Sequence, residues 1–158
     1  THLEQVDDKI FENLIKSIKK LSPETVLQTQ VITGFPGETE ASIRASSDFI
    51  IWLGLDDMNM SKFTPFPGAP IWSTIGEEGT FDEDWRLMNC LNFVFVPGEI
   101  TSKERLDQLY NEHVKRFYSD PQWRDKFRRR LWQHRKSMVY LIRHLPSFWS
   151  AKRQFEPK

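Results

Sequence analysis

The chain has 158 residues, 39% of them apolar and 28% charged, which is the balance of an ordinary globular protein. A single cysteine, Cys90, excludes a disulfide framework within the chain and any metal site made only of cysteines. No apolar run reaches the length of a membrane span and no secretory signal opens the sequence, so we expect a cytoplasmic protein. The sequence starts at Thr1 inside a helical pattern, which indicates a segment of a longer protein.

Charge is unevenly distributed along the chain, although the net charge is zero. Residues 115–158 hold thirteen Lys and Arg residues and three acids, a net charge of +10. The other nine basic and nineteen acidic residues leave −10 on the remainder. Such asymmetry indicates either a basic surface for an anionic partner or a tail that docks on its own acidic body.

The first part of the chain has the pattern of a helix followed by a strand. In residues 4–20 the apolar side chains recur every fourth position, at Val6, Ile10, Leu14 and Ile18. That spacing predicts an amphipathic helix, which Ser22-Pro23 ends. Residues 26–32 alternate between two faces and predict a strand, and residues 58–64 predict a second one.

A second helix is expected between the two strands, from Thr39 to about Leu53. Thr39 is a good N-cap and Gly54 a good C-cap. Because Ser42 rather than Glu or Gln stands three residues after Thr39, we expect the capping box to be incomplete. Helices that alternate with strands predict a parallel α/β arrangement. Two strands are too few for a stable parallel sheet, which again indicates a segment of a larger fold.

The second half of the chain is expected to be a connector followed by helices. Residues 73–100 indicate a loop, a short helix and an extended apolar patch at 89–98. Residues 101–118 predict a helix. A last helix begins at Asp120-Pro121, with Asp at the N-cap, and stops at Pro146.

The turn between the first strand and the second helix is the candidate ligand site. It reads Thr33-Gly34-Phe35-Pro36-Gly37-Glu38-Thr39 and lies at the carboxyl end of a strand, where α/β proteins bind ligands. Gly34 and Gly37 permit positive φ angles, and the N–H groups that open the next helix favour anions. Phe35 offers an aromatic surface, and Glu38 could accept from a ribose hydroxyl or an amine. A stiff loop without a ligand explains the same residues equally well.

The same turn resembles the "GFPGET" signature of radical S-adenosylmethionine (radical SAM) enzymes, which follows the fifth strand of a partial (β/α)6 barrel. Residues 63–70, Phe63-Thr64-Pro65-Phe66-Pro67-Gly68-Ala69-Pro70, are similar to the sixth-strand segment of that family. Phe63 replaces its usual tyrosine and Ala69 its usual threonine. The resemblance covers residues 1 to about 72.

This resemblance implies an α/β fold class: the last two βα units of the barrel in residues 1–72, an acidic and apolar connector in 73–100, and a basic α-helical extension in 101–158. It also implies a set of residues around S-adenosylmethionine. Ile32 would flank the adenine, Phe63 and Thr64 would close the pocket, and Gly34, Phe35, Gly37 and Glu38 would shape the turn. No catalytic residue carries over.

The family's chemistry needs a [4Fe–4S] cluster held by a CxxxCxxC loop, and this sequence lacks that loop. The cluster cleaves S-adenosylmethionine to a 5′-deoxyadenosyl radical, and the protein positions cofactor and substrate. The resemblance therefore implies an iron–sulfur oxidoreductase or transferase whose cluster ligands lie outside this chain. The missing amino-terminal half would be its main partner, and the isolated segment would be inactive.

Looser motifs resemble one branch of that family. They are Asp84-Trp85, the patch at 89–96, Leu109-Tyr110 and Arg116-Phe117-Tyr118. The branch has an amino-terminal cobalamin-binding domain and includes the anaerobic magnesium-protoporphyrin IX monomethyl ester cyclase. It implies a tetrapyrrole as the small-molecule substrate and cobalamin as a further cofactor. A basic tail near the barrel mouth would suit the propionates of such a substrate.

Other residues with reactive side chains favour structural roles. Cys90 is expected to be a buried small hydrophobe rather than a reactive thiol. The four histidines have no metal-ligand spacing, and the acids at 77–84 are expected to form a solvated turn rather than a cation site.

The last helix leaves the choice of partner open. Its apolar stripe is Trp123, Phe127, Leu131, His134, Met138, Leu141 and Leu145. We favour packing of this stripe within the protein, then a membrane surface or protein partner, and least of all a nucleic acid. The alternative to an enzyme fragment is thus a basic aromatic helical module that binds such a partner.

Overall fold

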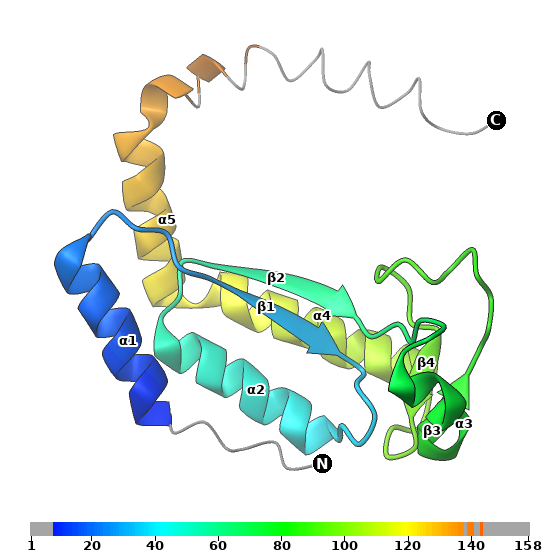
Figure 1. The fold of residues 1–158 in the computed structure, drawn as a ribbon. Helices are drawn as coiled ribbons and strands as arrows, with labels where there is room; N and C mark the ends of the chain where they lie inside the picture. Colours follow the sequence, from blue (N-terminus) through cyan, green and yellow to red (C-terminus); the bar gives the residue numbers. More distant parts are fainter. Residues whose placement is uncertain (1–7, 138, 141–142, 144–158) are drawn as a thin grey trace. The chain divides into compact units, whose positions relative to one another are not determined.

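The computed structural model describes residues 8–137, 139–140 and 143 (Figure 1). The chain divides after Trp123 into two compact units. The predicted features at Val6, Met138, Leu141, Leu145 and Pro146 lie outside the described residues.

The first unit begins with the predicted order of helix, strand, helix, strand. These elements are α1 (Asp8–Leu21), β1 (Gln28–Thr33), α2 (Glu40–Leu53) and β2 (Asp57–Lys62). The two strands pair in parallel, with Gln28 opposite Asp57 and Thr33 opposite Lys62. The predicted parallel α/β arrangement is therefore confirmed. Side chains along β1 alternate between exposed and half-buried, which confirms the two predicted faces.

The ends of α2 follow the predicted caps, with one correction. Gly54 adopts the left-handed conformation at φ 60°, and its N–H donates to the carbonyl of Ile51. At the other end, Thr39 Oγ1 accepts from Ser42 N and Ser42 Oγ accepts from Thr39 N, both at 3.0 Å. The prediction of an incomplete capping box was wrong, because the serine hydroxyl supplies the acceptor that a glutamate would supply.

The connector contains short elements. They are η1 (Pro70–Ser73), α3 (Ile75–Glu78), β3 (Gly79–Phe81) and β4 (Phe95–Pro97). Strands β3 and β4 pair antiparallel. The predicted apolar patch thus becomes core: Phe93, Val94 and Phe95 are each at most 3% exposed.

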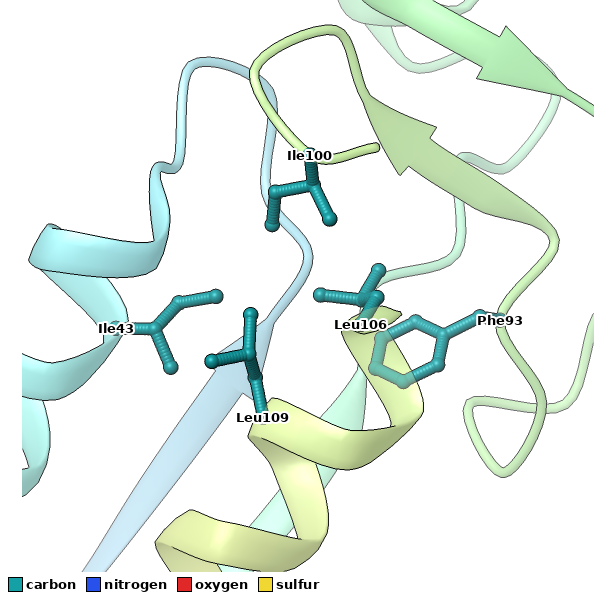
Figure 2. Packing of buried hydrophobic residues seen from close by; sticks show 5 residues of the cluster. All are labelled: Ile43, Phe93, Ile100, Leu106 and Leu109. Atoms are coloured by element: carbon teal, nitrogen blue, oxygen red, sulfur yellow. The ribbon is translucent and has the colours of Figure 1, made fainter. Parts of the chain in front are cut away.

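Helix α4 (Lys103–Ser119) lies in the same unit as the two parallel strands and packs along α2 (Figure 1). Its N-cap Ser102 accepts from Arg105 N. The main apolar cluster joins α2, the connector and α4, as Figure 2 shows, through Ile43, Phe93, Ile100, Leu106 and Leu109. A second cluster at the other end of α2 contains Ile50, Leu55, Met58 and Phe117.

Helix α5 (Pro121–Gln133) starts as predicted, because Asp120 Oδ1 accepts from Trp123 N at 3.0 Å. Trp123 belongs to the first unit, where its Nε1 donates to the carbonyl of Asp56 and its ring meets that of Tyr118 edge-on. In the described part of the chain, no helix combines the length and apolarity needed to cross a membrane.

Candidate ligand site at the carboxyl ends of the strands

The candidate turn lies where β1 and β2 end side by side. Phe63 N donates to the carbonyl of Thr33 at 2.8 Å, which joins the two strand ends. Gly34 has a φ of 88° and Gly37 a φ of 80°, in the left-handed region that side chains other than glycine rarely adopt. The turn therefore depends on glycine at both positions, as the sequence predicted.

Glu38 holds this turn closed. Its Oε2 accepts from Gly34 N at 2.6 Å and from Phe35 N at 3.2 Å. Burial raises the pKa of Glu38, and the two backbone hydrogen bonds oppose that rise. The carboxylate thus has a structural task in addition to the acceptor role expected for a ribose or an amine.

Replacing Glu38 by alanine is expected to lower the free energy of unfolding by about 1–3 kcal/mol, because the buried Gly34 N–H loses its acceptor. Glu38→Gln should lose much less, since its amide oxygen can still accept both N–H groups. Urea unfolding of both variants at neutral pH measures the difference. Equal losses in the two variants would show that the carboxylate charge, not the acceptor geometry, closes the turn.

An apolar surface lies beside the turn. Ile32 is 48% exposed and Phe35 is 47% exposed. The Phe35 ring contacts Phe63 edge-on, with 4.9 Å between centroids, and Phe63 in turn contacts Phe95 at 5.7 Å. Such edge-to-face pairs hold the rings in fixed orientations.

The predicted site residues therefore divide into three groups. Ile32, Phe35 and Gly37 are exposed, Glu38 is half-buried, and Gly34, Phe63 and Thr64 are buried. A ligand at this surface would touch Ile32 and Phe35 directly, whereas Phe63 supports Phe35 from behind. The expected closing role of Phe63 and Thr64 is thus indirect in this structure, because both are only 8% exposed.

The connector and helix α4 pack against the buried side of the turn. A Cβ atom on Gly34 would lie 3.0 Å from Phe93 Cε1 and 3.2 Å from Leu106 Cδ2. Sequence reasoning missed both supporting residues, because they lie 59 and 72 positions further along the chain, and no local pattern reports such contacts.

Lys62 was also missed, although its position at the end of β2 was a signal. Its Nζ donates to Asp107 Oδ1 at 2.5 Å and lies over the rings of Phe93 and Tyr110, at 4.5 and 5.0 Å from their centroids. The cation is therefore engaged by α4 and the connector, and it anchors them to the strand end.

Cys90 is half-buried rather than buried, which corrects the expectation for this residue. It has a φ of 61° in a short turn in which Asn89 Oδ1 accepts from Leu91 N. Within the described residues, no three His, Cys, Asp or Glu side chains converge on one point. The described residues thus do not fit an iron–sulfur cluster, and Ile32 and Phe35 leave apolar surface exposed beside the turn.

Comparison with known proteins gives partial matches to two enzymes. A probable threonylcarbamoyladenosine tRNA methylthiotransferase of Pyrococcus horikoshii is 38% identical over 59 residues, which are 37% of this chain and 14% of that protein. The ribosomal protein uS12 methylthiotransferase of Cutibacterium acnes is 36% identical over 103 residues, which are 65% of this chain and 21% of that protein. No protein-family model matches the chain.

The chain thus spans between about a seventh and a fifth of the length of these curated relatives. Neither relative's name mentions a tetrapyrrole or cobalamin. The chain is similar to parts of methylthiotransferases, and this similarity supports the radical SAM resemblance at the level of the superfamily but not the cyclase branch.

Proposed function

We propose that this chain is the last two βα units of a partial (β/α)6 radical SAM barrel, with a helical extension, and that its turn forms one wall of an S-adenosylmethionine site in a larger enzyme. The observation that carries the proposal is the exposed pair Ile32 and Phe35 beside a glutamate-locked turn at parallel strand ends. Ile32 and Phe35 would pack on the adenine and exclude water from it. Bound S-adenosylmethionine supplies the deoxyadenosyl group for radical chemistry.

An apolar groove supports the view that the sheet continues. Among the described residues β1 pairs with β2 along one edge, and its other edge faces a groove of about 460 Å³. The groove is lined mainly by apolar side chains of α1, β1 and α2, among them Phe11, Leu14, Ile15, Val31, Phe49 and Ile50. An open strand edge beside apolar side chains is costly in water, and another strand and its helix would cover both.

The test of the proposal compares this chain with the longer protein that contains it. Both are incubated with iron and sulfide without oxygen, then reduced with S-adenosylmethionine present. We expect iron–sulfur absorbance and 5′-deoxyadenosine from the longer protein and neither from this chain alone. A [4Fe–4S] cluster bound by this chain, or a longer protein that binds none, would overturn the proposal.

Phe35→Ala in the longer protein is expected to weaken S-adenosylmethionine binding by roughly tenfold, because about 1.5 kcal/mol of aromatic burial against the ligand is lost. Trp52→Ala is the matched control, since Trp52 is 54% exposed on the last turn of α2, far along the chain from the turn. Equilibrium dialysis measures both affinities. Unchanged binding in Phe35→Ala would remove this residue from the site.

The identity of the reaction is a narrower proposal. The names of the two relatives favour transfer of a methylthio group, whereas the looser carboxyl-terminal motifs favour a tetrapyrrole cyclase with cobalamin. We propose transfer of a methylthio group, because the similarity to the two relatives extends over 59 and 103 residues, whereas the motifs that favour a cyclase are short. Mass spectrometry of products from candidate RNA, ribosomal protein and tetrapyrrole substrates separates them, and cobalamin absorbance in the purified longer protein would favour the second.

A second candidate function rests on α5. Residues 121–137 hold seven Lys and Arg residues and one acid, Asp125. Trp132 is 73% exposed, and Arg135 lies over its ring at 5.3 Å. We propose that this helix binds an anionic membrane surface, where aromatic and basic side chains act together. Co-sedimentation with anionic but not neutral vesicles supports the proposal, whereas salt-dependent binding to nucleic acid alone would refute it.

A further inference from the structure

Two buried polar side chains, one on α2 and one on α4, have no hydrogen-bond partner among the described residues. His113 on α4 is 2% exposed, and Ser47 on α2 is 1% exposed. Neither ring nitrogen of His113 nor the hydroxyl of Ser47 has a hydrogen-bond partner among the described residues. Leaving such groups unpaired costs free energy, so native proteins almost always satisfy them.

Both side chains line one small cavity between the two helices. Its volume is about 10 Å³, and its other lining residues are Ile43, Arg44, Leu109, Glu112 and Arg116. A space of this size is about the minimum that holds one water molecule. It excludes any larger ligand.

We propose that Ser47 and His113 hold a single buried water that bridges α2 and α4. The hydroxyl of Ser47 can donate and accept, and a neutral imidazole offers one N–H and one lone pair. A water between them therefore finds two or more polar partners, which is what an internal water requires. Ile43 and Leu109 of the main core line the same cavity, so the water belongs to the packing behind the candidate turn.

Burial, more than the charged groups around the ring, favours the neutral form of His113. On α2, Arg44 pairs with Glu112 at 2.9 Å and Asp48 pairs with Arg116. On α4 itself, Glu112 and Arg116 are these same partners, and β4 carries no ionisable side chain. Burial, and then the charge of Arg116, lowers the pKa of His113. The neutral form is the one that can both donate to and accept from a water.

A pH dependence follows from the lowered pKa. The pKa of His113 is lower in the folded protein than its ordinary value of 6.5 in the unfolded chain. As the pH falls below 6.5, the unfolded chain therefore binds this proton before the folded protein does. The contribution of His113 to stability should be fully present well above that pH, fall as the pH drops from 6.5 towards the lower folded pKa, and level off below it. Urea unfolding between pH 5 and 8 measures this, and His113→Leu should remove this part of the dependence.

The decisive experiment is a double-mutant cycle on the full chain at pH 7.5, with Ser47→Ala, His113→Leu and both together. If a water bridges the pair, each single change raises the unfolding equilibrium constant roughly 5- to 30-fold. The double change then raises that constant by much less than the product of the two single fold-changes. If no water is present, each single change removes an unpaired polar group and stabilises the fold, which would overturn the proposal. Ser46→Ala, at an exposed neighbouring position, is the control and should change the constant less than about twofold.

A second test uses the unchanged protein and therefore does not depend on whether the variants fold. Nuclear Overhauser peaks between the His113 ring protons and a long-lived water are expected. Their absence from a folded sample would overturn the proposal.

Discussion

Gly34→Ala is expected to lower the free energy of unfolding by about 2–5 kcal/mol. One part, about 1–2 kcal/mol, comes from placing a Cβ at a left-handed φ of 88°. The other part, about 1–3 kcal/mol, comes from overpacking, since the new Cβ would lie 3.0 and 3.3 Å from Phe93 ring atoms and 3.2 Å from Leu106 Cδ2. Leu106 is fully buried, so these neighbours have little room to move.

Gly37→Ala provides a matched control for Gly34→Ala. Gly37 has nearly the same φ, 80°, but a Cβ added there would have no atom within 4 Å beyond its own chain neighbours. We therefore expect about 1–2 kcal/mol from backbone strain alone. Urea unfolding of the two variants separates strain from packing. Equal losses would show that Phe93 and Leu106 do not press on the turn, and would contradict the support described for the ligand site.

Asp56→Ala is expected to cost about 2–4 kcal/mol, because it removes a buried carboxylate that pairs with Lys19 and leaves Leu27 N without its acceptor. The Asp56 side chain is 3% exposed. Its Oδ2 accepts from Lys19 Nζ at 2.6 Å and from Leu27 N at 2.9 Å. Asp56 lies immediately before β2. Its carboxylate thus joins the last turn of α1 to the segment that leads into β1.

Two further variants test the cause of that loss. Asp56→Asn keeps an oxygen for Leu27 N and should lose less than Asp56→Ala. Glu12→Ala removes an exposed pair, Glu12–Lys16, on the same helix and should change stability by at most about 0.5 kcal/mol. Thermal unfolding followed by circular dichroism compares all three. A loss in Asp56→Ala no larger than in Glu12→Ala would contradict a structural role for the buried pair.

Much of the local structure could be predicted, because its causes lie within a few residues. Thr39 and Gly54 bound α2 as expected, Asp120 caps α5, and β1 shows its two alternating faces. These features depend on hydrogen bonds and periodicities between near neighbours. The capping box failed as a prediction only because a serine was not counted as an acceptor.

The sequence predicted where the candidate site lies, but not which of its side chains are exposed. The turn and its two glycines lie where the pattern placed them, at the carboxyl end of β1. Whether Phe63 faces a ligand or the core depends on Phe95, which lies 32 residues later. The same is true of Lys62, whose charge is bound by Asp107.

The order of the elements and the glycine turn follow from residues close together in the chain, and the alternation of helix and strand predicted the parallel pairing. Tertiary contacts establish which side chains of the turn are open to a ligand, which residues pack against Gly34, and that Ser47 and His113 line one cavity. The reason is that burial depends on which distant segments pack together, and a one-dimensional pattern contains the propensity of each segment but not its neighbours in space.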